Sequence, residues 1–202
     1  MHTVGPASFL DLGGFAIVGS RDVGPKAADV AKAAAAAAAG AGRIVVSGGA
    51  RGTDRLAMNA AIASDGNVVG LLADALAKAV NDAEVRRLVS DERLCLATPC
   101  APTAPFSTGY AMGRNKLIYA SADVTLVVAS DLEKGGTWAG ATEALTHGFG
   151  RVAVWLGDGA GPGNTALAEL GAIGVSDLDA LADTASAAVP AAPRADQLGL
   201  HL

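Results

Sequence analysis

Several short segments of this chain are almost wholly apolar, and this feature constrains the fold more than any other. They lie at 15–20, 43–47, 68–72, 94–98, 124–129 and 152–156. Strands without polar alternation are typical of a parallel sheet whose two faces are both covered. Helical patterns separate these segments, so the sequence predicts an α/β fold with a mostly parallel, doubly wound sheet in three α/β/α layers.

The helices between these segments have recognisable starts and stops. Pro25 suits the first position of a helix, because a proline there loses no hydrogen bond. Thr53 or Asp54 is expected to cap a second helix. Thr137 is expected to cap another, which ends before Gly148. The helices are predicted over 25–40, 54–64, 73–92, 111–121 and 137–147.

The length of the chain, 202 residues, fits a single domain. We expect an N-terminal extension over 1–13, one domain over 14–189 and a flexible tail over the Ala- and Pro-rich residues 190–202. No apolar stretch reaches the roughly 18 residues that cross a bilayer, and the first residues lack the pattern of a secretory signal. The sequence therefore predicts a cytoplasmic protein with no membrane partner.

The residues present disfavour metal, cofactor and catalytic-triad chemistry. Cys95 and Cys100 have the spacing of neither a redox motif nor half a zinc site, so buried thiols are expected. His2, His147 and His201 are scattered along the chain, which leaves no metal-binding cluster. The GxGxxG motif of dinucleotide oxidoreductases and the GxxxxGKS/T motif of P-loop enzymes are also absent. We therefore expect no metal and no cofactor.

The charge distribution limits where a polyanion can bind. A net charge of −5 disfavours a broad attraction to nucleic acids, so any such site must be local. Acidic residues such as Asp22, Asp54 and Asp131 also stand near the basic ones. The basic residues in or beside Gly-rich turns are Arg21, Arg51, Arg55, Arg114, Lys116 and Lys134.

Three Gly-rich turns follow predicted strands, at 19–21, 47–53 and 134–137. The carboxyl ends of parallel strands meet at one edge of a sheet, where helix amides face a ligand crevice. Glycines let successive amides bind an anion, and arginines add paired contacts to phosphate oxygens. Ordinary strand-to-helix turns also carry glycine for geometry alone, and this alternative stays open for each turn. The candidate phosphate-binding residues in the turns are Gly19, Ser20, Arg21, Ser47, Gly48, Gly49, Arg51, Gly52, Thr53, Lys134, Gly135, Gly136 and Thr137.

A further polar group precedes the strand at 124–129. It adds the candidates Arg114, Asn115 and Lys116 near a helix start. The aromatic side chains close to these loops can stack on nucleobases, although core or lid packing is an equal alternative for each ring. These stacking candidates are Phe106, Tyr110 and Trp138.

The order of the motifs resembles a known family. AIVGSR is followed by VVSGGARGTD, by GRNKLI before an apolar strand, by KGGTWAGATEAL and by GNTALAELGA. This series resembles the DprA/Smf DNA-processing proteins over about residues 14–175. RNK stands where the family has RNR, so Lys116 keeps the charge of an arginine but not its planar fork.

The resemblance implies a Rossmann-like domain that binds single-stranded DNA and helps to pass it to a recombinase. It also implies a homodimer as the expected assembly. The family's binding positions fall on Gly19, Ser20, Arg21, Ser47, Gly48, Gly49, Arg51, Gly52, Arg114, Asn115 and Lys116.

An enzyme that cleaves the N-glycosidic bond of a nucleoside monophosphate is the alternative. The chain is distantly similar to the Lonely Guy-type phosphoribohydrolases, because GGT at 135–137 leads to Glu143 and Met112 leads to Arg114. On that hypothesis a nucleotide is the partner, and Glu143 and Arg114 are catalytic. Glu143 comes one residue late, which rotates it by about 100° on a helix. A solvent-facing Glu143 and a protein that binds without catalysis are therefore favoured.

Overall fold

In residues 1–186, the part of the chain that the structure describes, eight strands form one sheet. This computed structural model has the strands β1 (His2–Val4), β2 (Phe15–Val18), β3 (Val45–Ser47), β4 (Val68–Leu71), β5 (Leu94–Thr98), β6 (Val124–Val127), β7 (Arg151–Trp155) and β8 (Ile173–Val175). Their order is β1-β5-β4-β3-β2-β6-β7-β8, and only the β1–β5 pair is antiparallel among these strands. The predicted mostly parallel sheet is confirmed.

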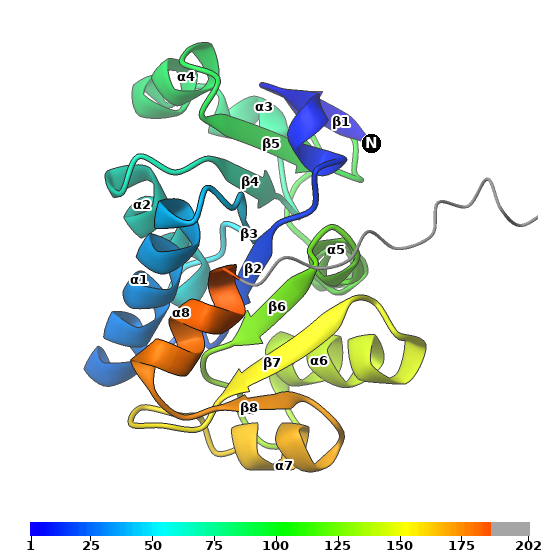
Figure 1. Cartoon of the computed structure of the whole chain (residues 1–202). Helices are drawn as coiled ribbons and strands as arrows, with labels where there is room; N and C mark the ends of the chain where they lie inside the picture. Colours follow the sequence, from blue (N-terminus) through cyan, green and yellow to red (C-terminus); the bar gives the residue numbers. More distant parts are fainter. Residues whose placement is uncertain (187–202) are drawn as a thin grey trace, which may run out of the picture.

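Helices cover both faces of the sheet (Figure 1). One face carries α1 (Pro25–Gly40), α2 (Thr53–Ala63) and α8 (Leu178–Ser186). The other carries α5 (Thr108–Ala120), α6 (Gly135–His147) and α7 (Asn164–Glu169). Two short helices, α3 (Leu76–Ala79) and α4 (Ala83–Ser90), lie between β4 and β5. The predicted three layers are confirmed.

Side chains of the central strands pack alternately on the two faces. Phe15 and Ile17 of β2 join the cluster under α1 and α2, whereas Ala16 and Val18 join the cluster under α5 and α6. Because both faces are covered, a polar side chain without a partner is costly at either set of positions. This burial explains the apolar strands of the sequence.

The chain order creates a crevice beside β2. From β2 the chain moves outward through β3, β4 and β5, and then α5 carries it back to β6 on the other side of β2. The helices that follow β2 and β6, α1 and α6, lie on opposite faces of the sheet. Loops that diverge in this way leave a ligand crevice at the carboxyl ends of the two strands.

Helix ends differ in part from the predictions. Pro25 at the start of α1 and the left-handed Gly148 after α6 are confirmed. The predicted side-chain caps at Thr53, Asp54 and Thr137 are wrong, because all three lie inside the first helical turns. The N-caps are Gly52 for α2 and Lys134 for α6, neither with a side-chain cap bond.

Both edges of the sheet hold strands that the sequence did not predict. Residues 1–13, expected as an extension, contribute β1 and a short 3-10 helix, Ala7–Leu10. At the other edge β8 pairs with β7, and α8 follows it. The predicted tail over 190–202 lies outside the described residues. Among the described helices, none is both long and apolar enough to cross a bilayer.

Asn164, at the start of α7, joins the ends of β6 and β7. Its Oδ1 accepts a hydrogen bond from the Ser130 N–H at 2.9 Å. Its Nδ2 donates to the carbonyl oxygens of Val128 at 2.9 Å and Trp155 at 2.7 Å. The side chain is fully buried, so no water replaces these bonds easily. Asn164 therefore anchors the loop that leaves β6 toward the crevice.

Replacing Asn164 with alanine is expected to lower the free energy of unfolding by about 2 kcal/mol, because buried backbone groups lose their partners. Denaturant unfolding measures this change. The matched control is Asn67→Ala at an exposed position, which should change stability by less than about 0.5 kcal/mol. Equal stabilities of the two variants would show that Asn164 does not anchor the loop.

Candidate functional site

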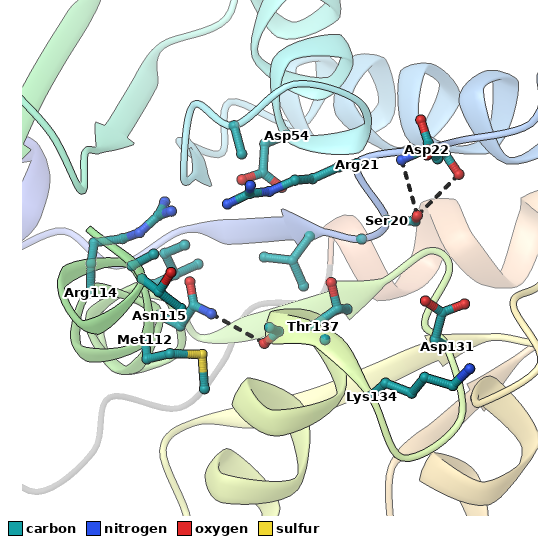
Figure 2. A pocket seen from close by; sticks show the side chains of 18 of the residues that line it. Ser20, Arg21, Asp22, Asp54, Met112, Arg114, Asn115, Asp131, Lys134 and Thr137 are labelled. Carbon is teal, nitrogen blue, oxygen red and sulfur yellow. Dashed lines mark hydrogen bonds between the residues drawn. The ribbon is translucent and has the colours of Figure 1, made fainter. Parts of the chain in front are cut away.

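A cavity of about 680 Å³ opens at the carboxyl ends of β2 and β6 (Figure 2). Its walls come from the loop after β2, the loop between β6 and α6, and one side of α5. The predicted turns at 19–21 and 134–137 thus meet here, together with α5. The sequence had placed the ligand crevice at this edge of the sheet.

Arg114 contributes a buried guanidinium to the cavity wall. The residue is 4% exposed, and its Nη1 donates to the Leu71 carbonyl oxygen at 2.7 Å. Its Nε has no hydrogen-bond partner among residues 1–186. Gly48 lies against the guanidinium, because a Cβ at residue 48 would overlap it and lie 2.6 Å from Oδ2 of Asp54. A glycine is therefore needed at 48 for this packing.

Asp54, in the first turn of α2, lies close to Arg114 and is 7% exposed. Burial raises the pKa of its carboxyl to about 6, although Arg114, two backbone N–H groups and Arg21 act in the opposite direction. The two N–H groups belong to Gly48 and Ala50, in the turn expected to bind an anion. Part of that turn therefore binds a carboxylate of the protein itself.

Arg21 and Phe106 lie where the larger cavity meets a smaller one. The guanidinium carbon of Arg21 lies 5.6 Å from the centre of the Phe106 ring, a cation–π distance, and the ring is about half exposed. Both residues line the cavity at β2 and β6, and both also line a smaller cavity of about 260 Å³. Gly48, Gly49 and Arg51 line only this smaller cavity.

The opposite wall is formed by α5 and the start of α6. Nδ2 of Asn115 donates to the Gly136 carbonyl oxygen at 3.1 Å and so joins the two helices (Figure 2). Lys134 and Thr137 line the same wall. The other predicted residues that line the larger cavity are Gly19, Ser20, Gly135 and Gly136. Ser20 bonds with its hydroxyl to the backbone of Asp22.

Tyr119 lies at the base of the larger cavity with an unpartnered hydroxyl. It is 2% exposed, and burial followed by the nearby Asp54 raises the pKa of its phenol. With the Nε of Arg114, this hydroxyl offers polar atoms that no group of the described chain satisfies. Such atoms favour a polar ligand or water.

Three predicted site residues lie behind the cavities. Ser47 is fully buried, and its hydroxyl donates to the Ile17 carbonyl oxygen at 2.6 Å. Thr53 is also fully buried, and its hydroxyl and its N–H both donate to the Ser20 carbonyl. Gly52, with φ +81°, packs against the same loop. These residues hold the turns after β2 and β3 together, and the structure places none of them on a cavity wall.

The remaining predicted residues lie away from the cavity walls. Lys116 Nζ pairs with Glu143 Oε1 at 2.7 Å between α5 and α6, and neither residue lines the cavities. Trp138 is partly buried against the core under α6. Tyr110 is 46% exposed beside the start of α5. Because Glu143 is paired outside the cavity, the geometry does not favour the phosphoribohydrolase alternative.

Sequence reasoning missed Asp54, Tyr119 and Arg55 as site residues. Arg55 was noted as a basic residue but was not assigned to a site, although it lines the smaller cavity. Asp54 was expected only as a helix cap, and no spacing in the sequence distinguishes that role from burial. Both cysteines are buried, as expected. Within the described residues no group of His, Cys, Asp and Glu side chains could hold a metal ion.

Comparisons with known proteins identify relatives of the chain. The family model for DNA recombination-mediator protein A matches residues 1–185. No curated protein matches the sequence significantly.

Solved structures share the fold. DNA processing protein A from Streptococcus pneumoniae aligns with a TM-score of 0.74 at 20% identity, over 89% of this chain and 64% of that one. DNA processing protein A from Helicobacter pylori, described for its unique single-stranded DNA binding mode, aligns with a TM-score of 0.73 at 22% identity. The alignment covers 90% of this chain and 84% of that one. The molybdenum cofactor carrier protein from Chlamydomonas reinhardtii aligns with a TM-score of 0.59 at 18% identity, over 84% of this chain and 93% of that one. At these identities the likeness shows a common Rossmann-like fold.

Proposed function

Because this chain belongs to the DNA recombination-mediator protein A family, we propose that it binds single-stranded DNA in the crevice at the ends of β2 and β6. The observation that carries the proposal is Arg114, a largely buried arginine that lines the wall of this polar cavity. A phosphate oxygen or a base edge is the kind of acceptor that a guanidinium on a cavity wall binds.

The other cations of the cavity support a phosphate contact. Arg21 and Lys134 stand on the loops after β2 and β6, on opposite sides of the opening. Asn115 adds an amide, and the exposed Phe106 ring offers an apolar surface for a base. Because the protein carries a net charge of −5, these local cations must overcome a repulsive overall field.

A single strand suits this site better than a duplex. The cavity lies between loops and has room for nucleotides that are not paired, whereas duplex recognition commonly uses a helix or strand that enters a groove. No bond-breaking step is part of the proposal, since the residues that line the cavity include no histidine to act as a general base.

Fluorescence anisotropy of a labelled short oligo-dT tests the proposal. We expect the affinity to fall with salt, with a log–log slope of about −0.7 for each phosphate neutralised. Replacement of Lys134 with alanine should reduce the magnitude of the slope by about 0.7. Duplex DNA should compete poorly. Equal competition by duplex, or absence of binding at low salt, would refute the proposal.

Assembly and partners form a further part of the proposal. The chain covers 64% of the length of the pneumococcal structure, so activities of that whole protein do not transfer directly. Family membership supports a cytoplasmic homodimer that passes the bound strand to a recombinase. Light scattering with and without oligo-dT measures the assembly, and a monomer at all concentrations would exclude the dimer.

A further inference from the structure

The smaller cavity at the ends of β3 and β4 is unusually rich in arginine. Its volume is about 260 Å³, and its walls include Arg21, Arg51, Arg55 and Arg114. Asp74 is the carboxylate that lines it. Guanidinium groups bind phosphate oxygens through paired N–H donors, so this lining fits a phosphate better than an apolar or cationic group.

The charges of Arg51 and Arg55 in this cavity are not paired within the described residues, whereas Arg114 interacts with Asp54 and Asp74. No ion pair or hydrogen bond of the described residues involves the guanidinium groups of Arg51 and Arg55, both of which belong to exposed residues. Several cations elsewhere are paired, as in Arg43 with Asp123 and Arg93 with Asp65. Unpaired arginines on a concave surface raise the local concentration of anions.

Local structure directs Arg55 toward an anion. It stands in the first turn of α2, and its N–H donates to the Ala50 carbonyl across the Gly-rich turn. The positive end of the helix dipole adds to the side-chain charges at this point. Gly48 and Gly49, the latter with φ +66°, also line this cavity, and a Cβ would meet the Arg114 guanidinium at residue 48 and the Leu72 side chain at residue 49.

The smaller cavity adjoins the larger one. Arg21, Phe106 and Arg114 line both, so a ligand in one contacts residues that also face the other. Arg51 and Arg55 belong to the smaller cavity alone, whereas Asn115 and Lys134 belong to the larger alone. A strand that passes over Arg21 and Phe106 can therefore place successive nucleotides in the two cavities.

We propose that the smaller cavity is a second phosphate subsite, in which Arg51 and Arg55 bind the backbone phosphate next to the one held at the larger cavity. This inference rests on the proposed function and extends it. It assigns a path to the strand, between α5 and Lys134 at one end and the start of α2 at the other, across Arg21. It also makes the site selective for ligands with at least two phosphates joined through a nucleoside.

Ligand length provides the test. Thymidine monophosphate, thymidine diphosphate, the dinucleotide pTpT and a short oligo-dT are used as competitors against labelled oligo-dT. The variants are Arg51→Ala and Arg55→Ala, with Arg151→Ala as the matched control. Arg151 is exposed at the amino end of β7, whereas the cavities lie at the carboxyl ends of the strands. Thermal unfolding of each variant checks the fold.

We expect Arg55→Ala to weaken the binding of oligo-dT and pTpT by roughly tenfold, because a charged hydrogen bond is lost in one subsite only. The affinity for thymidine monophosphate should stay unchanged. The salt slope for oligo-dT should shrink by about 0.7, and Arg51→Ala should act alike. The Arg151 variant should match the parent protein.

Other results would overturn the inference. If Arg55→Ala binds oligo-dT with unchanged affinity and slope, the smaller cavity holds no phosphate, although the proposed function stands. If thymidine diphosphate competes better than pTpT, the site is built for a diphosphate and not for a strand. If the parent protein does not bind oligo-dT at all, the proposed function itself fails. The parent protein is therefore measured before any variant.

Discussion

Replacement of Arg114 with alanine is expected to weaken the binding of short oligo-dT by about 100-fold, which corresponds to the loss of one or two charged hydrogen bonds. The guanidinium lines both cavities and is held by the Leu71 carbonyl at 2.7 Å. Because it is already ordered, it loses little entropy when a ligand arrives. Anisotropy measures the affinity, and the magnitude of the salt slope should fall by about 0.7.

The same substitution is expected to lower stability, because Asp54 loses its main opposite charge in a buried position. A cost of about 3 kcal/mol is typical for this kind of change. Arg114→Lys separates the two effects, since an ammonium keeps the charge but cannot form the planar fork. We expect the lysine variant to recover most of the stability and only part of the affinity. An alanine variant that is folded and binds oligo-dT normally would remove Arg114 from the site.

Much of the fold could be predicted because burial on both faces leaves a direct trace in the sequence. Strands such as β2 and β4 are apolar at successive positions, and Pro25 and Gly148 mark helix ends through their own backbone geometry. The edge strands β1 and β8 could not be predicted in this way. Each has three residues and exposed positions, so no apolar run distinguishes it from a loop.

The position of the site could be predicted, but the role of each side chain could not. Parallel strands bring the turns that follow them to one edge of the sheet. This rule predicts that the Gly-rich turns at 19–21 and 134–137 lie together. Whether Ser47 and Thr53 face the crevice depends on their exact placement behind the turn, and both donate inward to backbone carbonyls. The pairing of Lys116 with Glu143 depends on how α5 packs on α6, which the sequence alone does not specify.

Asp54 could not be predicted because charged side chains are seldom buried, so a surface cap is the ordinary expectation for an aspartate that follows a turn. Three features keep the Asp54 side chain buried. They are distant from one another in the sequence or depend on packing, so the sequence does not reveal them. They are the approach of α5, the lack of a side chain at Gly48 and the amides of the turn. The carboxyl group of Asp54 can therefore titrate among the cations of the crevice.

The stability of the protein is expected to depend on the protonation of Asp54. The pKa of its carboxyl is raised from 3.8 to about 6 in the folded chain. The folded state thus retains this proton over a range in which the unfolded state has lost it, so its contribution is fully present below pH 3.8 and is lost as the pH rises through about 6. A rise of this size corresponds to about 3 kcal/mol.

Asp54→Asn removes the titrating group and should remove this dependence. We expect the stability of the parent protein relative to the variant to fall by about 3 kcal/mol as the pH is raised from about 3 to about 7, measured by urea unfolding. Asp29→Asn, at an exposed position on α1, is the control. A bound phosphate near Asp54 would favour its protonated form further, so oligo-dT should bind the parent protein more tightly at about pH 6 than at about pH 8, and the asparagine variant should lose that difference. Parallel pH profiles for parent and variant, in stability and in binding alike, would show that Asp54 is not the coupled group.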